Sequence, residues 1–99
     1  STAENLKDAV AGETHEYKEM YPDFVKQAEA EGNKAALMTF TFAMKAEEVH
    51  ARLYQEALEN LDETEEVFYY LCPVCGNIEK IRPDKCSICN VPGDKFIKY

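Results

Sequence analysis

The amino-terminal third of this chain places apolar residues every three or four positions, which is the pattern of an amphipathic helix. Ser1-Thr2-Ala3-Glu4 resembles a capping box, so we expect the helix to begin at the amino terminus and to run to about Glu31. Pro22 interrupts the pattern, but the apolar stripe resumes in phase at Phe24, which predicts a kink or local bulge. The stripe consists of Leu6, Val10, Met20, Phe24 and Ala28.

A second amphipathic stretch follows the turn signal Gly32-Asn33 and predicts a helix from about Lys34 to Leu61. Two such helices form a hairpin that buries only one face of each, so its core is expected to be thin and the chain to oligomerise. The second stripe consists of Leu37, Phe40, Met44, Ala51, Tyr54, Leu58 and Leu61.

The last third of the chain is aromatic and β-branched and is punctuated by proline and glycine. It predicts a strand at Val67–Leu71 and a closing strand at Lys95–Tyr99, with two cysteine-bearing turns between them. About thirty residues bury too little to fold unaided, so a metal is expected to stabilise this part. We therefore predict a helical hairpin at residues 1–63, a short polar linker at Thr64-Glu65-Glu66, and a small metal-stabilised β domain at residues 67–99.

Glu47 falls in register with the second apolar stripe, where a hydrophobic residue is expected. His50 follows three residues later, so a carboxylate and an imidazole share one helical face. Burying an unpaired carboxylate costs several kcal/mol or more, so such a residue is usually neutralised, salt-bridged or bound to a metal. The register of Glu47 therefore predicts a site.

Glu13 and, slightly off-centre, Glu16 interrupt the first stripe in the same way, one turn apart. Antiparallel packing of the two helices brings them towards Glu47 and His50, and this set of oxygen ligands and one imidazole suits iron or manganese. Isolated Glu-x-x-His pairs on helices are usually solvated surface, but the register and Glu13 favour a metal site here. Neighbouring candidates are assigned no ligand role, because Glu48 lies beside the stripe and His15 faces away from it.

Four cysteines form two Cys-x-x-Cys pairs separated by ten residues, which is a strong signal for one tetrahedral metal centre. Spacing alone fits a structural zinc ribbon or a mononuclear iron centre. Knuckles of the form Cys-Pro-x-Cys-Gly flanked by aromatic residues resemble rubredoxin, and an electron carrier beside a carboxylate metal site makes chemical sense. The predicted ligands are Cys72, Cys75, Cys86 and Cys89.

The net charge of −8 and the lack of a Lys/Arg cluster argue against nucleic acid and against anionic membranes as partners. No apolar run reaches the length of a membrane span, and the amino terminus lacks the features of a secretory signal. Paired cysteines suggest metal binding in a reducing compartment. We therefore expect a cytoplasmic protein.

The segment Gly12–Pro22, the segment Ala46–His50 and the two cysteine knuckles, in that order, resemble rubrerythrin. The resemblance covers the whole chain but corresponds to the latter half of a typical family member, whose earlier helix pair carries its own Glu and Glu-x-x-His ligands. It implies a ferritin-like four-helix bundle with a di-iron site, followed by a rubredoxin-like domain. The implied activity is that of an oxidoreductase, a non-haem peroxidase that reduces hydrogen peroxide to water.

The resemblance also implies residue roles: Glu13, Glu47 and His50 are iron ligands, Glu16 is a catalytic carboxylate that binds iron in one oxidation state, and Tyr21 is a tyrosine beside the site. The second hairpin is expected from a second copy of the chain or from a separate chain carrying the amino-terminal half. The four-cysteine centre is expected to dock against a bundle supplied by a neighbouring subunit. Its electrons are expected from an external donor such as rubredoxin or its reductase.

Two other functions remain open. One is a non-catalytic assembly module with structural zinc and a hairpin that pairs subunits. The other, iron storage, is weaker because nothing in the sequence suggests a shell-forming surface.

Overall fold

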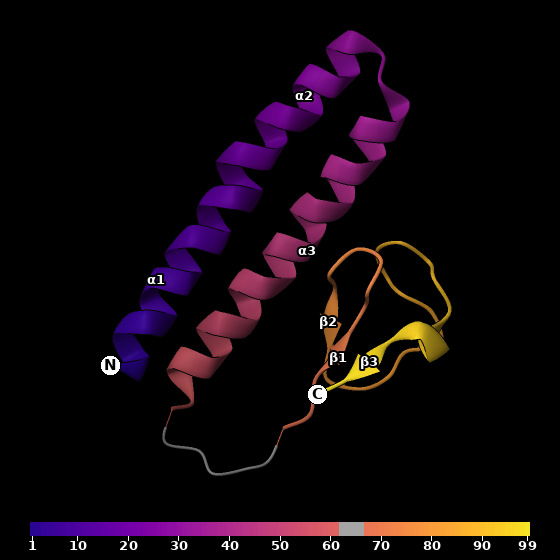
Figure 1. Ribbon diagram of the computed structural model, residues 1–99. Coiled ribbons are helices and arrows are strands. Elements are labelled where there is room, and N and C mark those ends of the chain that lie inside the picture. The colour runs from indigo at the N-terminus through magenta and orange to yellow at the C-terminus, as the bar shows by residue number, and fades with distance from the viewer. Residues whose placement is uncertain (62–66) are drawn as a thin grey trace.

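A long helical hairpin and a small β-structured module make up the described chain, residues 1–61 and 67–99, in the computed structural model (Figure 1). The module lies alongside the second arm of the hairpin, and the amino terminus lies at the open end of the hairpin. The predicted linker Thr64-Glu65-Glu66, with the boundary at residues 62–63, falls outside the described residues. The order of helices and then a metal-knuckle module agrees with the predicted fold.

The first arm is one continuous rod with a π-helical turn in its middle. Ser1 caps it, because its side-chain oxygen accepts the backbone N–H of Glu4 at 3.2 Å. Pro22 stands in the first turn of the helix that follows the π turn, where its missing N–H is tolerated. The predicted local bulge near Pro22 is therefore confirmed as a π turn. The three segments are α1 (Thr2–His15), η1 (Glu16–Met20) and α2 (Tyr21–Glu31).

The turn between the arms follows the predicted Gly32-Asn33 signal. Gly32 takes a left-handed conformation with φ 68°, which a glycine adopts without a Cβ penalty. The Asn33 side chain then accepts the N–H of Ala36 at 3.0 Å and caps α3, which spans Lys34–Glu59. The helix ends two residues before the predicted Leu61: the backbone of Asn60 leaves helical geometry, with φ −116° and ψ 30°, and its side chain donates to the Glu56 carbonyl at 2.8 Å.

The hairpin is a single layer of helices. Its fully buried residues within the described chain are the small ones where the two arms touch, namely Ala28, Ala46 and Ala51. The whole Cα trace is 14 Å thick in its shortest dimension, little more than one helix diameter. Large apolar side chains such as Phe24 and Met38 are 41% and 55% exposed. The predicted thin core is therefore confirmed, and the hairpin faces lack a covering layer in the described structure.

None of the described helices combines the length and the apolar composition that crossing a membrane requires.

The module contains one antiparallel sheet of very short strands in the order β2-β1-β3 among the described residues. Leu71 of β1 pairs with Ile78 of β2 on one side and with Ile97 of β3 on the other. The backbones of Tyr69 and Tyr99 add two hydrogen bonds of 3.2 and 2.8 Å beyond the last pair. The strands are β1 (Tyr70–Leu71), β2 (Ile78–Glu79) and β3 (Ile97–Lys98).

Both predicted strands are found in shortened form, and β2 was missed. The predicted strand at Val67–Leu71 is reduced to two residues, and Lys95 of the predicted closing strand belongs to the 3-10 turn η2 (Gly93–Lys95). The first knuckle ends β1 at Leu71 because the Cys72 N–H bonds the Asn77 carbonyl, and the Lys95 N–H bonds the Pro92 carbonyl in η2 instead of joining the sheet.

A small core of sulfur and aromatic carbon holds the module together. Cys72, Cys86 and Phe96 are buried, and the other two cysteines pack around them. Arg82 ties the chain across this core, since its guanidinium donates to the carbonyls of Gly93 and Phe96 at 3.0 and 2.8 Å. The thiols are thus the centre of the fold, as expected of a module that a metal stabilises.

Two contacts fasten the module to α3 of its own chain. Lys80 forms an ion pair of 2.9 Å with Glu56, and the His50 ring lies 2.6 Å from the Gly76 carbonyl oxygen. The ion pair lowers the pKa of Glu56 and raises that of Lys80 through their hydrogen bond and mutual charge. In the structure the module contacts α3 of its own chain, where Lys80, directly after β2, reaches Glu56. Docking against a bundle supplied by a neighbouring subunit, which the resemblance implies, stays a prediction.

Replacing Gly93 with alanine is expected to destabilise the module. A Cβ at this buried position would overlap the backbone carbonyl of Pro83, which a flexible side chain cannot relieve. We expect a loss of about 2 kcal/mol or more in the free energy of unfolding, as for other overpacked sites. Thermal unfolding of metal-loaded protein measures it. Gly12→Ala is the matched control, since nothing lies within 4 Å of its Cβ; equal melting temperatures for both variants would contradict the prediction.

Candidate metal centres

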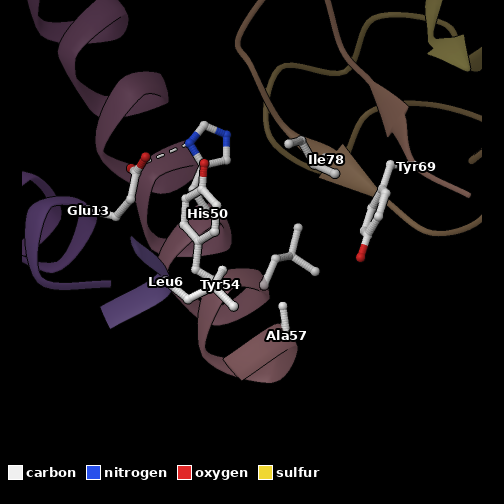
Figure 2. A pocket seen from close by; sticks show the side chains of 8 residues that line it. Leu6, Glu13, His50, Tyr54, Ala57, Tyr69 and Ile78 are labelled. Atoms are coloured by element: carbon white, nitrogen blue, oxygen red, sulfur yellow. Dashed lines mark ion pairs between the residues drawn. The ribbon is translucent and has the colours of Figure 1, made fainter. Parts of the chain in front are cut away.

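Three of the predicted ligands meet between the two arms of the hairpin. Glu13 projects from α1, and Glu47 and His50 project from adjacent turns of α3. One ligand atom from each lies within 4.8 Å of the others. The Nδ1 atom of His50 is 3.5 Å from a carboxylate oxygen of Glu13 and 3.8 Å from one of Glu47. Figure 2 shows the Glu13 carboxylate directed at the imidazole ring.

The two carboxylates are incompletely satisfied. The side chains of Glu13, Glu47 and His50 are 20%, 17% and 20% exposed. One oxygen of Glu13 and one of Glu47 are buried without a hydrogen-bond partner among the described residues. A buried acceptor without a partner costs about 1–3 kcal/mol, and more when it is charged. The pair therefore fits a cation held between them.

The hydrogen bond on the far side of the imidazole supports the same conclusion. Nε2 of His50 donates to the Gly76 carbonyl at 2.6 Å, so in a neutral ring Nδ1 carries the lone pair. That lone pair faces Glu13 and Glu47. Three electron-rich groups repel one another unless a proton or a metal ion lies between them. A ring that donates to a backbone carbonyl on one side and ligates on the other is the usual arrangement of a metal-bound histidine.

Glu16 and Tyr21 are not part of this cluster. Glu16 is half-buried and opens the π turn, where its carbonyl accepts the N–H of Tyr21. The Tyr21 ring packs against Phe24 and Phe40, with centroids 5.8 and 6.3 Å away. Their predicted roles therefore remain predictions.

Two neighbouring candidates lie outside the cluster. His15 is exposed and pairs with Glu19 at 2.9 Å, and Glu48 is exposed on α3.

An open pocket of about 460 Å³ adjoins the cluster, between α1, α3 and the module. Glu13 and His50 form its polar end, and Leu6, Leu53 and Ile78 contribute apolar walls. In Figure 2 the Tyr54 ring extends from α3 towards the Glu13–His50 pair, while Tyr69 lies on the module side. The pocket gives a small molecule access to the cluster. No local sequence pattern predicts it, because its walls come from three separate elements.

The four cysteine sulfurs form the second centre. All four cysteines are free thiols, and their sulfurs lie within 4.8 Å of one another. Sγ of Cys72 is 3.6 Å from that of Cys89, and Sγ of Cys75 is 3.7 Å from that of Cys86. A tetrahedral ion with metal–sulfur bonds of about 2.3 Å requires sulfur–sulfur distances of about 3.8 Å. The thiols are therefore spaced for one tetrahedral metal ion.

The two knuckles are built alike, because the same backbone bonds close each of them. The N–H group of Cys72 donates to the carbonyl of Asn77, and that of Cys86 donates to the carbonyl of Val91. Each acceptor lies five residues after the donor, and both distances are 2.8 Å. Gly76 and Asn90 close the turns in left-handed conformations, with φ 84° and 66°. A Cβ atom built on Gly76 would lie 3.9 Å from the His50 ring, so the first knuckle reaches the helical cluster.

The metal-free thiols differ in acidity. Burial raises the pKa of Cys75 and of Cys89 above the ordinary thiol value. Burial also acts on Cys86, but the backbone N–H groups of Cys89 and Ile88 outweigh it and lower the pKa of Cys86 to about 7. One sulfur is thus prepared to ionise while its neighbours retain protons until a metal displaces them.

Sequence reasoning missed two groups at these centres. The Gly76 carbonyl is a backbone atom and leaves no signal in the sequence. Asn77 is 1% exposed and contacts Cys86 through its side chain; its counterpart in the second knuckle is Val91, and comparing the two knuckles position by position would have revealed the difference.

The family model for rubrerythrin matches residues 1–58. Nigerythrin from Nitratidesulfovibrio vulgaris is 42% identical over 96 residues, which cover 96% of this chain and 48% of that protein. Rubrerythrin-2 from Clostridium acetobutylicum is 40% identical over 102 residues, covering 94% of this chain and 53% of that protein.

The whole chain superimposes on a solved structure of nigerythrin in its fully reduced, all-ferrous state, with a TM-score of 0.94 at 41% identity. The match covers half of the nigerythrin chain. The chain spans about half the length of the curated relatives it matches. The match includes both the hairpin and the cysteine module. The family model covers the hairpin, and the relatives match both the hairpin and the module. The chain therefore belongs to the rubrerythrin family.

Proposed function

We propose that this chain supplies half of a non-haem di-iron peroxidase that reduces hydrogen peroxide to water, with electrons delivered through an iron centre on the four cysteines. The observation that carries the proposal is the cluster of Glu13, Glu47 and His50. Nδ1 of His50 lies 3.5 and 3.8 Å from the two carboxylates, and each carboxylate has a buried oxygen without a hydrogen-bond partner among the described residues. Membership of the rubrerythrin family supports iron in preference to other cations.

Glu13, Glu47 and His50 would hold iron in the helical site. The iron, when bound, supplies the two electrons that accompany two protons in converting one hydrogen peroxide to two waters. The chain's part is positional: Gly76 fixes the His50 ring through Nε2, so that Nδ1 stays aimed at the carboxylates. The carboxylates keep the charge of the site negative enough to hold cations in a half-buried location.

Glu16 and Tyr21 belong to the same proposal as supporting groups. Glu16 lies one turn after Glu13, on the wider π turn, and such turns occur often at functional sites. Its carboxylate stands outside the present ligand cluster, which suits a group that binds in one oxidation state only. Tyr21 follows directly after the π turn and has a hydroxyl able to donate a proton or hydrogen bond near the site.

The pocket of about 460 Å³ favours a small substrate. Its walls are mainly apolar, and Glu13 and His50 lie together at one end. Hydrogen peroxide is small and neutral, so it can approach this end without the charge repulsion that an anion would meet at the carboxylates. The pocket therefore supports peroxide as the substrate.

A second hairpin is needed to complete the proposed site. One hairpin offers two carboxylates and one imidazole at the cluster, roughly half of what a di-iron bundle uses. We propose that a second copy of the chain, or a separate chain with the amino-terminal half of the family fold, covers the open face and adds the remaining ligands. An external electron donor such as rubredoxin or its reductase would then recharge the cysteine centre, in a reducing, cytoplasmic setting.

Replacing Glu47 with alanine is expected to remove peroxide reduction while leaving the thiolate centre intact. The variant loses a ligand of the helical site, so the rate of peroxide consumption by reduced, iron-loaded protein should fall about a hundredfold or more. The visible ferric-thiolate absorption should persist, because the cysteines lie in the other module.

Glu48→Ala is the matched control for this test, since Glu48 is the next residue on α3 and is exposed. It should retain the wild-type rate. Equal rates in the two variants would remove Glu47 from the site, and a colourless wild-type protein with one zinc ion per chain would favour the non-catalytic assembly module.

Assembly through the open face is expected to depend on Phe24. This side chain is 41% exposed on α2, so Phe24→Asp should weaken association at least tenfold by placing a charge in the covered layer. Native mass measurement over a range of concentrations reports it. Lys26→Asp, about 200° around the helix, adds a larger charge change on the opposite side and should leave the assembly intact. A wild-type chain that stays monomeric while its helical site is filled with iron would contradict the proposal.

Metal binding by the four cysteines is expected to weaken as the pH falls. Burial raises the pKa of Cys75 and Cys89, and the pKa of Cys86 is about 7, so binding must release protons. Lowering the pH from about 8 to about 6 should therefore reduce the affinity at least about tenfold per pH unit. Competition with a chelator of known affinity measures this slope. An affinity that does not change over this interval would show that the thiols are ionised before the metal binds.

A further inference from the structure

The two cysteine knuckles share their closing backbone bonds but differ in a buried side chain. Asn77 and Val91 occupy equivalent places, since each carbonyl accepts the N–H of the first cysteine of its knuckle at 2.8 Å. Their side chains differ: one is an amide and the other a hydrocarbon. Asn77 therefore brings a polar group to the centre that its counterpart lacks.

The Asn77 side chain crosses from the first knuckle to the second. Its amide nitrogen lies 3.6 Å from Sγ of Cys86 and 3.5 Å from the hydroxyl oxygen of Ser87. A thiolate accepts hydrogen bonds and cannot donate them, so a metal-bound Cys86 requires the nitrogen of the amide, not its oxygen, to face the sulfur. At 1% exposure the Asn77 side chain is shielded from bulk solvent.

Cys86 consequently receives an additional donor. The backbone N–H of Ile88 lies 3.4 Å from its Sγ. The Asn77 amide adds a further N–H, at a place where the other knuckle carries the hydrocarbon side chain of Val91. Donors to a thiolate stabilise negative charge on sulfur, and that charge is greater when a bound iron is reduced.

We propose that Asn77 is a positioning residue that raises the reduction potential of the four-cysteine centre by donating its side-chain N–H to Sγ of Cys86. The inference rests on the proposed thiolate metal centre and assigns to one side chain the control of how readily that centre accepts an electron. Within the module, the Cys86 sulfur is then the ligand on which added charge is best stabilised.

The decisive variant is Asn77→Val, which gives the first knuckle the same residue as the second at this position. In the full chain reconstituted with iron, the ratio of reduced to oxidised centre at a fixed ambient potential should fall by roughly fivefold, because the reduced state loses one hydrogen bond to charged sulfur. A potentiometric titration followed by the visible thiolate absorption measures the shift. An unchanged potential in fully loaded Asn77→Val protein overturns the proposal.

Ser87→Ala is the matched control, since it removes the other partner of the Asn77 amide without touching the sulfur bond. It should leave the potential unchanged. An equal shift in both variants overturns the proposal, because the effect would then come from packing or hydration of the second knuckle.

A second measurement uses the wild-type chain and so does not depend on a variant that retains iron. With ¹¹³Cd in place of iron, the Asn77 side-chain amide proton should show scalar coupling to the metal through Sγ of Cys86. Absence of this coupling overturns the proposal. This measurement does not depend on peroxide turnover. If the protein carries zinc, the proposed function is refuted, and the cadmium coupling still tests the hydrogen bond separately.

Discussion

Two carboxylates turned into the seam of a helical hairpin need positive charge between them, and the rest of the structure is organised around that need. Glu13 and Glu47 each have a buried oxygen without a hydrogen-bond partner in the described chain. Nδ1 of His50 is the nitrogen that lies near both carboxylates. A hydrophobic residue at either position would pack the two arms more favourably. The acids are therefore explained by what they bind and not by stability.

The cysteine module takes part in this organisation through the His50 ring. Its first knuckle presents the Gly76 carbonyl to Nε2, so the same glycine that closes the turn around two sulfurs also orients the ligand of the helical cluster. The Lys80–Glu56 ion pair holds the two parts together nearby. Exposed ion pairs of this kind contribute little stability alone, so the short His50 contact is the more important constraint on the docking.

Two features of this chain add to what the family resemblance implies: the four sulfurs have unequal surroundings, and one face of the helical layer is uncovered. Asn77 gives Cys86 a donor that Val91 cannot provide to the other knuckle. The hairpin, one helix layer thick, exposes apolar side chains such as Phe24 that a second pair of helices would cover. The Asn77 donor affects where an added electron is stabilised. The uncovered layer shows that a single chain offers only part of the ligands.

Local patterns in the sequence predicted the hairpin, its Gly32-Asn33 turn, the bulge before Pro22 and the residues that gather in the two clusters, Glu16 excepted, because helical periodicity, capping and Cys-x-x-Cys spacing act over a few residues. The strands were predicted too long, and β2 was missed. Only the tertiary structure decided that Glu16 stands outside the cluster, that the module docks on its own α3, and that Asn77 reaches Cys86. These depend on contacts between residues distant in the chain, and no local pattern encodes their distances.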